Sequence, residues 1–120
     1  MDHQVEYWFR GKKFTGGWEY GGINDKGDCI VSCHQFIPVD PQTVGMKSPY
    51  HDIHRCGIYS GDILRLWTGD KKLLLIVIWS GWEFDLSIHP NSETEKLPKD
   101  FIINKCKIVG NVWEGVIDDW

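Results

Sequence analysis

The stretch Gly57-Ile58-Tyr59-Ser60-Gly61-Asp62-Ile63-Leu64-Arg65 opens the part of the chain that decides the fold. Residues 63–67 are apolar apart from Arg65, and Thr68-Gly69-Asp70-Lys71-Lys72 supplies a turn. Residues 73–79, LLLIVIW, then form a continuous apolar run. A run of this length with β-branched residues is typical of a strand covered on both faces. The pattern predicts two strands joined by a turn.

Strict alternation follows the apolar run, so that two sets of side chains point to opposite faces of a strand. The apolar set is Trp82, Phe84, Leu86 and Ile88, and the polar set is Glu83, Asp85, Ser87 and His89. This pattern predicts a half-buried strand with one solvated face. A polar loop over residues 90–100 leads to the last strands, between Phe101 and Trp113.

The N-terminal third is expected to hold three short strands, at Val5–Phe9, Trp18–Ile23 and Cys29–Cys33. The first two are expected to pair as a hairpin. Residues 24–28, NDKGD, are a strong turn signal because Asn, Asp and Gly tolerate positive φ and make local hydrogen bonds. Residues 1–35 therefore read as a small β-meander.

The periodic pattern fails between residues 36 and 56. Pro38, Pro41 and Pro49 remove backbone donors from any sheet, and the apolar residues between them follow neither strand nor helix spacing. We expect an irregular connector here. Asp40 is a candidate N-cap for one helical turn with Pro41 at its first position, where a missing N–H costs nothing.

Several segments together resemble the YopX family of phage and prophage proteins, over nearly the whole chain. Besides residues 57–65 they are Phe9-Arg10-Gly11-Lys12, Gly17-Trp18-Glu19-Tyr20-Gly21, Asp40-Pro41-Gln42-Thr43-Val44-Gly45 and Val109-Gly110-Asn111-Val112-Trp113. The resemblance implies a small, mainly β protein with an SH3-like barrel in its C-terminal half and no established activity. The chain departs from the family at Tyr50–Cys56, where relatives tend to carry a Gly/Asp/Asn-rich turn.

Four positions match the family's pattern: Gly61, Asp62, Gly110 and Asn111. Glycines beside Asp or Asn more often form turns than sites, so we interpret these positions as structural. The expected organisation is one YopX-like unit over residues 1–120. Its parts are a meander at 1–35, a connector at 36–56, the SH3-like barrel at 57–113 and an acidic tail at 114–120.

Composition points to a soluble protein. No segment approaches the eighteen or so apolar residues that a membrane helix needs, and the start, Met1–Glu6, lacks the features of a signal peptide. We therefore expect no membrane association and a cytoplasmic location in a bacterial host. The net charge of −4 and pI near 5.6 disfavour non-specific binding to nucleic acid.

Metal binding is a less favoured alternative. Thiolate and imidazole groups gather in residues 29–56, and zinc is usually held by four such ligands. Strand periodicity places Cys29 and Cys33 on one face and His34 on the other, so the spacing matches a zinc site poorly. We expect no metal and no cofactor, and keep a zinc-dependent activity as the second alternative. Its candidate ligands are Cys29, Cys33, His34, His51, His54 and Cys56.

Catalysis is also disfavoured. Asp52 lies between His51 and His54, which suggests a hydrolase, but neighbours on a loop do not by themselves bring a base and a nucleophile together. The sequence contains no nucleophile elbow, no phosphate-binding Gly-rich loop and no His-Glu-x-x-His motif. We expect no enzyme and no catalytic residue.

Seven tryptophans in 120 residues are the one compositional excess. Trp67, Trp79, Trp82 and Trp113 are assigned to the core because they lie in or beside strands. The tryptophans expected to be exposed are Trp8, Trp18 and Trp120. Exposed aromatic side chains on an acidic protein suit a protein partner better than nucleic acid.

We therefore expect a non-enzymatic accessory protein that binds a protein, either from the host or the phage, or another copy of itself. The candidate binding residues are Trp8, Arg10, Lys12 and Trp18. The first alternative is a nucleic-acid-binding small barrel with neighbouring aromatic side chains. Its candidate contacts are Arg10, Lys12, Lys105 and Lys107.

Overall fold

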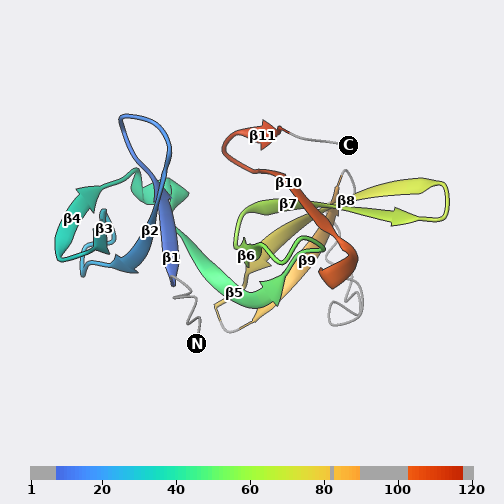
Figure 1. Ribbon diagram of the computed structural model, residues 1–120, viewed down its shortest axis with the longest axis horizontal. Helices are drawn as coiled ribbons and strands as arrows, with labels where there is room; N and C mark the ends of the chain where they lie inside the picture. Colours follow the sequence, from blue (N-terminus) through green and yellow to red (C-terminus); the bar gives the residue numbers. More distant parts are fainter. Residues whose placement is uncertain (1–7, 82, 90–102, 118–120) are drawn as a thin grey trace. The chain divides into compact units, whose positions relative to one another are not determined.

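A computed structural model describes residues 8–81, 83–89 and 103–117 of the chain (Figure 1). These residues are mainly β and form two antiparallel sheets with two short 3-10 helices. The chain divides into two compact units, Met1–Lys47 and Ser48–Trp120, and the boundary falls within β5 (Gly45–His51). The six-stranded sheet continues through β5 to a strand of the second unit at residues 57–59, whereas the five-stranded sheet belongs to the second unit alone.

The first unit is an antiparallel meander of four strands, whereas the sequence predicts three. Its strands are β1 (Phe9–Lys12), β2 (Trp18–Ile23), β3 (Cys29–Ser32) and β4 (Gln35–Pro38). Neighbours along the chain pair with one another, and the start of β5 pairs with β1 through Phe9 and Met46. The predicted first strand falls mostly outside the described residues, and β1 at its end supplies the hairpin with β2.

The turn between β2 and β3 forms where the sequence predicts it. The Asn24 Oδ1 accepts hydrogen bonds from the backbone N–H groups of Asp28, at 3.1 Å, and Cys29, at 3.0 Å. Its Nδ2 donates to the Asp28 carboxylate at 2.8 Å, and this bond lowers the pKa of Asp28. The next turn contains Cys33 and His34 at positive φ, so β3 ends earlier than predicted and strand alternation does not reach Cys33.

Residues 36–56 are more regular than predicted. They contain most of β4, the 3-10 helix η1 (Pro41–Thr43) and all of β5. Two of the prolines fit because Pro38 ends β4, an edge strand of its sheet, and Pro41 takes the first helical position. Pro49 lies inside β5. The Asp40 side chain accepts from the Gln42 N–H at 3.1 Å, which confirms the predicted N-cap.

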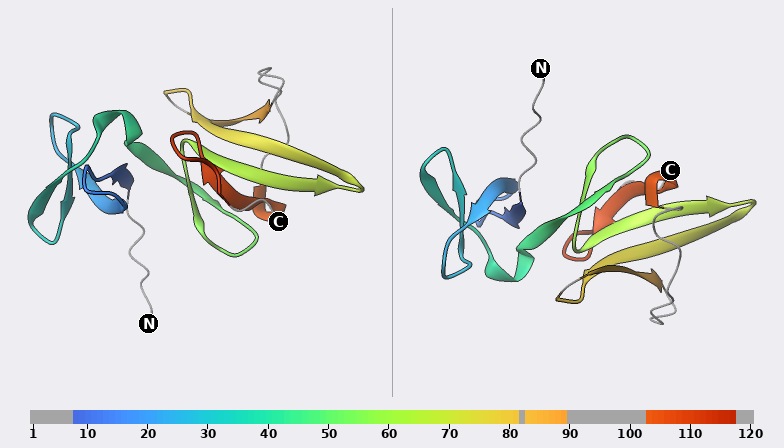
Figure 2. Two further views of the ribbon diagram at one scale, coloured as in Figure 1. Left: turned by 90° about the horizontal axis from the view of Figure 1, so that it is seen from above. Right: turned by 90° about the horizontal axis from the view of Figure 1, so that it is seen from below.

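The second unit is built on a five-stranded antiparallel sheet in the order β11-β10-β7-β8-β9. The β7–β8 hairpin, green to yellow in Figure 2, lies between β10 and β9. Among the described strands β9 and β11 stay unpaired with each other, so this sheet does not close into a barrel. The elements are β6 (Gly57–Tyr59), β7 (Asp62–Thr68), β8 (Lys71–Trp79), β9 (Phe84–His89), η2 (Ile103–Lys105), β10 (Lys107–Asn111) and β11 (Gly115–Val116).

One face of the five-stranded sheet forms the core of this unit. Leu64 pairs with Leu75, and both side chains are fully buried. Val77 pairs with Leu86 on the same face. Burial of this apolar surface, at about 25 cal/mol per Å², is the main force that stabilises the unit. The other members of this core are Ile58, Leu66, Phe84, Ile103, Cys106 and Val109.

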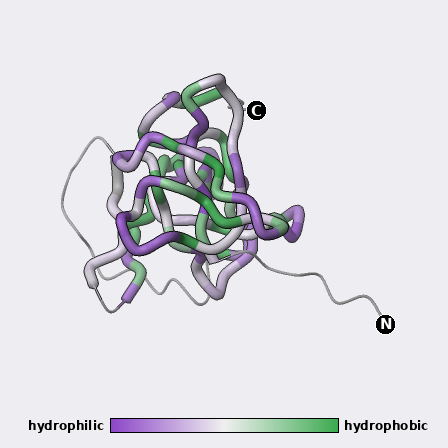
Figure 3. The backbone as a smooth tube through the Cα atoms, turned by 90° about the vertical axis from the view of Figure 1, so that its left-hand side faces the viewer, coloured by the Kyte–Doolittle hydropathy of each residue, from purple (hydrophilic) through white to green (hydrophobic). Residues whose placement is uncertain are grey.

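The predicted alternation in β9 is partly confirmed. Phe84 and Leu86 are buried as expected, but Ser87 on the opposite face is also buried, so that face is not uniformly solvated. Hydrophobic stretches are short and alternate with hydrophilic ones along the chain (Figure 3). In the part of the chain that the structure describes, the helices are too short to cross a membrane. Predictions that fall outside the described residues concern Trp82, the 90–100 loop, Phe101, Asp118, Asp119 and Trp120.

Candidate functional site

The binding residues predicted from the sequence lie on β1 and β2 or next to them. Trp8, just before β1, is 72% exposed, as expected. Arg10 is buried instead, with its guanidinium carbon 4.9 Å from the centroid of the Trp18 ring, and Trp18 is half-buried. The Lys12 backbone N–H donates to the Thr43 Oγ1 at 2.8 Å. Arg10 and Trp18 therefore meet in a packed cation–π pair and do not form an exposed patch.

The cations of the nucleic-acid alternative are divided between the two units. Arg10 and Lys12 belong to the first unit, whereas Lys105 and Lys107 belong to the second. Lys105 ends η2 and is exposed, and Lys107 begins β10 and is half-buried. Neither unit by itself contains all four residues predicted to contact nucleic acid.

Asp52 organises the loop that suggested a hydrolase. It is only 5% exposed, and its Oδ1 accepts from the N–H groups of His54, at 2.9 Å, and Cys56, at 2.8 Å. Its Oδ2 accepts from the Ile108 N–H at 3.2 Å, which ties the loop to β10. The carboxylate is thus engaged by backbone donors, which is the arrangement of a loop-stabilising group.

Two thiols near Asp52 are held in the neutral form. Burial raises the pKa of Cys106 to about 11, and the negative charge of Asp52 adds to the effect. Burial and the same carboxylate also raise the pKa of Cys56. Within residues 8–81, 83–89 and 103–117, no three His, Cys, Asp or Glu side chains gather as metal ligands do. The zinc alternative has no candidate cluster there.

We expect the cysteines to differ strongly in reactivity toward iodoacetamide at pH 8. Cys106 is fully buried, and a pKa of about 11 in place of 9.0 leaves it about a hundredfold less thiolate. Cys33 is exposed, so it is expected to be alkylated first. Peptide mass spectrometry over time measures the order. Equal rates for Cys33 and Cys106 in folded protein would contradict this account.

The outer face of the five-stranded sheet is the opposite of the core face, and it is also largely apolar. Because Leu64 and Leu66 point into the core, alternation places Ile63, Arg65 and Trp67 on the outer face. Across the β7–β8 pair these three are opposite Ile76, Leu74 and Lys72 respectively. Ile63 is buried, but Ile76 and Leu74 are half-buried, so part of the apolar surface on this face stays accessible.

An apolar hollow of about 320 Å³ lies on the outer face. Val112 and Val116, which help to line it, are 46% and 42% exposed. β11 reaches this position because Val116 pairs with Gly110, which in turn pairs with Ile63 on β7. The lining residues are Ile63, Leu74, Ile76, Val112, Gly115 and Val116.

The turn between β10 and β11 holds the wall of the hollow in place. The Asn111 Oδ1 accepts from the N–H groups of Trp113, at 3.1 Å, and Glu114, at 3.0 Å. A Cβ on Gly110 would lie 2.0 Å from the Gly115 carbonyl oxygen, so only glycine allows β11 to approach this closely. Gly110 and Asn111 therefore build a turn, as interpreted from the sequence.

Gly61 and Asp62, also interpreted as structural from the sequence, build a turn between β6 and β7. Gly61 has a φ of +90°, and a Cβ there would lie 2.4 Å from the Trp113 ring. Its N–H donates to the Val77 carbonyl at 2.8 Å. The Asp62 Oδ2 accepts from the Tyr59 N–H at 2.8 Å. These contacts fix the start of β7, and with it the outer face.

Arg65 is the functional candidate that sequence reasoning missed. Its Nε and Nη1 atoms are buried and have no hydrogen-bond acceptor among the described residues. Its guanidinium carbon is 5.9 Å from the Trp67 ring centroid. Trp67, which was predicted to be in the core, is 55% exposed. The sequence signal was the single charge inside an otherwise apolar strand.

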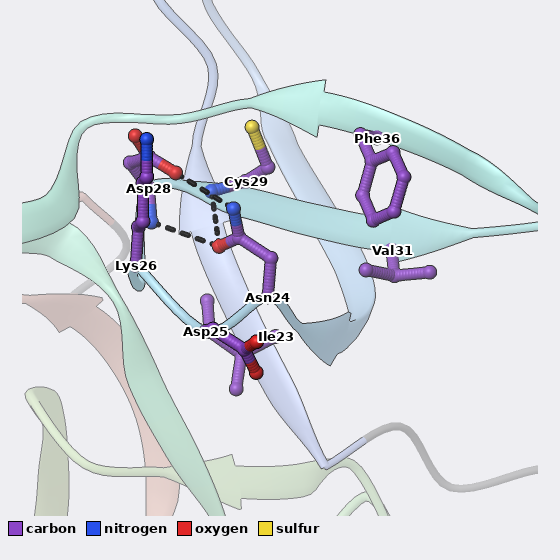
Figure 4. A pocket seen from close by; sticks show the side chains of 8 residues that line it. All are labelled: Ile23, Asn24, Asp25, Lys26, Asp28, Cys29, Val31 and Phe36. Carbon is purple, nitrogen blue, oxygen red and sulfur yellow. Dashed lines mark hydrogen bonds between the residues drawn. The ribbon is translucent and has the colours of Figure 1, made fainter.

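A second cleft, of about 640 Å³, lies in the first unit around the β2–β3 turn (Figure 4). The polar groups of Asn24 and Asp28 bond to each other within it. Burial raises the pKa of Cys29, so this thiol stays neutral. Because Asn24 and Asp28 already bond to each other, these two groups offer less to a ligand than the apolar hollow does. The remaining lining residues are Ile23, Asp25, Lys26, Val31 and Phe36.

Comparison with known proteins yields no match: the sequence fits no protein-family model, and it resembles no curated protein and no solved structure significantly.

Proposed function

We propose that this protein is a non-enzymatic protein-binding module and that the outer face of the five-stranded sheet is its binding surface. The observation that carries the proposal is the apolar hollow, with Val112 and Val116 both exposed on its wall. Contiguous apolar surface of this kind typically marks an interaction site, because a free soluble protein gains from covering it. The exposed Trp67 ring on the same face adds the kind of side chain that binding sites favour.

The resemblance to the YopX family extends the proposal to a phage or prophage accessory protein with an SH3-like second unit. An acidic chain repels polyphosphate, so a protein is favoured over nucleic acid as the partner. Nuclease treatment in the experiment below distinguishes this protein-binding function from the alternative of nucleic-acid binding.

Affinity capture with matched variants tests the proposal. The tagged full chain is incubated with bacterial lysate, with and without nuclease, and the proteins retained are quantified by mass spectrometry. We expect a specific protein to be retained after nuclease treatment and to fall at least tenfold in the Val112→Glu/Val116→Glu double variant. The reason is that two buried carboxylates without partners are costly in an apolar contact.

Phe36→Glu is the matched control, because Phe36 is 68% exposed but belongs to the first unit. It is expected to retain the same protein. Capture that is insensitive to the double variant overturns the proposed surface. Loss of all retained material on nuclease treatment favours the nucleic-acid alternative instead.

A further inference from the structure

We infer that the apolar hollow binds a protein segment in which a carboxylate lies within one or two residues of an apolar side chain, and that Arg65 receives the carboxylate. This inference rests on the proposed protein-binding function and names the chemistry of its partner. The apolar side chain would enter the hollow lined by Ile63, Leu74 and Ile76.

Arg65 stands directly beside the hollow. It is two residues from Ile63 on β7 and directly opposite Leu74 on β8, and both of these residues line the hollow. Neighbours across an antiparallel pair have Cβ atoms about 5 Å apart, and residues two apart on a strand are separated by about 7 Å. An extended peptide covers the same distance in one or two residues, which sets the spacing of the two groups.

The guanidinium of Arg65 calls for a charged acceptor. Two of its nitrogens are buried without an acceptor among the described residues, and a buried charged donor left in this state is unfavourable. A carboxylate offsets this cost better than a neutral carbonyl oxygen because hydrogen bonds between two charged groups are stronger. The unmet donors therefore favour an acidic partner over a purely apolar one.

The charged residues closest to Arg65 in the strand register are also positive. Lys107 is opposite Arg65 on β10, and Lys72 is opposite Trp67 on β8, so all three cations share the outer face. Among the acidic residues, Asp85 lies on this face opposite Ile78, and Glu114 adjoins Gly115, which lines the hollow. Although the chain has a net charge of −4, the cations Lys72 and Lys107 next to Arg65 on this face favour an acidic segment over a neutral one.

Matched peptide arrays test the inference directly. One array presents acetylated, amidated nonapeptides in which a central Leu, Ile or Phe is followed one or two residues later by Glu. The second array is identical except that Gln replaces Glu. We expect the full 120-residue chain to bind members of the Glu array at least tenfold more tightly than their Gln counterparts.

Variants assign the preference to Arg65. Arg65→Gln is expected to reduce Glu binding to the Gln level, whereas Lys107→Gln changes it less than about threefold, because a partly exposed point charge is screened at 150 mM salt. The double variant Val112→Glu/Val116→Glu should abolish binding of both the Glu peptides and the Gln peptides. Thermal unfolding of Arg65→Gln provides the fold check, and its midpoint is not expected to fall, because the variant replaces unmet charged donors with a neutral amide that is less costly to bury.

Four results would overturn the inference. Equal affinity for the Glu and Gln arrays excludes the role of the carboxylate, and a preference that survives Arg65→Gln excludes the role of Arg65. If sedimentation shows a dimer, and the double variant Val112→Glu/Val116→Glu dissociates it, the hollow is occupied by a second copy of this chain and not by an acidic segment. Absence of any peptide binding, with lysate capture still sensitive to the double variant, rejects the acidic segment and leaves the proposed protein-binding function standing.

Discussion

Replacing Gly110 with alanine is expected to detach β11 and remove the hollow while the core of the second unit survives. The new methyl group would meet the Gly115 carbonyl oxygen at 2.0 Å and the Val116 Cα at 2.9 Å, and backbone cannot move aside without breaking the β10–β11 pair. We expect the free energy of unfolding to fall by about 2 kcal/mol. Capture of the protein partner should also be lost, because Val116, which forms part of the wall of the hollow, detaches with β11.

Two measurements check this prediction. Urea unfolding gives the stability change, and amide exchange reports on the pairing, because the Ile117 N–H donates to the Val109 carbonyl at 2.7 Å only while β11 is in place. Gly22→Ala is the control, since its Cβ would meet Val31 at an ordinary 3.9 Å. It is expected to change stability by no more than about 0.5 kcal/mol. Full partner capture by Gly110→Ala would contradict the role given to β11.

Asp52→Ala is expected to destabilise the protein by about 2–4 kcal/mol. The substitution leaves the N–H groups of His54, Cys56 and Ile108 without their acceptor and frees the loop from β10. Asp52→Asn is expected to cost less, about 1–2 kcal/mol, because one oxygen remains but the amide nitrogen cannot accept. Urea unfolding followed by tryptophan fluorescence measures both.

Asp40→Ala serves as the comparison for Asp52→Ala. The Asp40 carboxylate accepts one backbone N–H, from Gln42, in an exposed turn, so we expect a cost of about 0.5–1 kcal/mol. If the two alanine variants lose equal stability, Asp52 does not anchor the loop as described. A second readout is the alkylation of Cys106, which should speed up in Asp52→Asn because the nearby negative charge is gone.

Local signals in the sequence were sufficient to place most strands. β2 spans the residues predicted for it, and the Asn24–Asp28 turn forms through the side-chain bonds that make such sequences turn formers. β7 and β8 each extend beyond the predicted apolar runs because polar residues continue the strands into a tight turn. Pro38 and Pro41 misled the prediction, since strand ends and helix starts accept proline, and Pro49 lies inside β5.

The candidate site was harder to predict because it depends on which face of a strand is covered. The run from Leu73 to Trp79 is apolar at every position, which is typical of a strand covered on both faces, yet Ile78 is 39% exposed. For the same reason two residues differ from their predictions. Arg10, predicted as a binding residue, is buried, and Trp67, predicted to be in the core, is exposed. The residue types along a strand do not show which of its two faces another part of the chain covers. Tertiary contacts determine this.

Site-specific photocrosslinking is the most direct test of the claim that the outer face binds a protein. A benzophenone amino acid is placed at position 116 or, as control, at position 36, both of which carry exposed apolar side chains. The tagged full chain is irradiated in bacterial lysate after nuclease treatment. We predict a discrete protein adduct at position 116 and none of the same mass at position 36. The same adduct from position 36 alone, or none from position 116, would contradict the account.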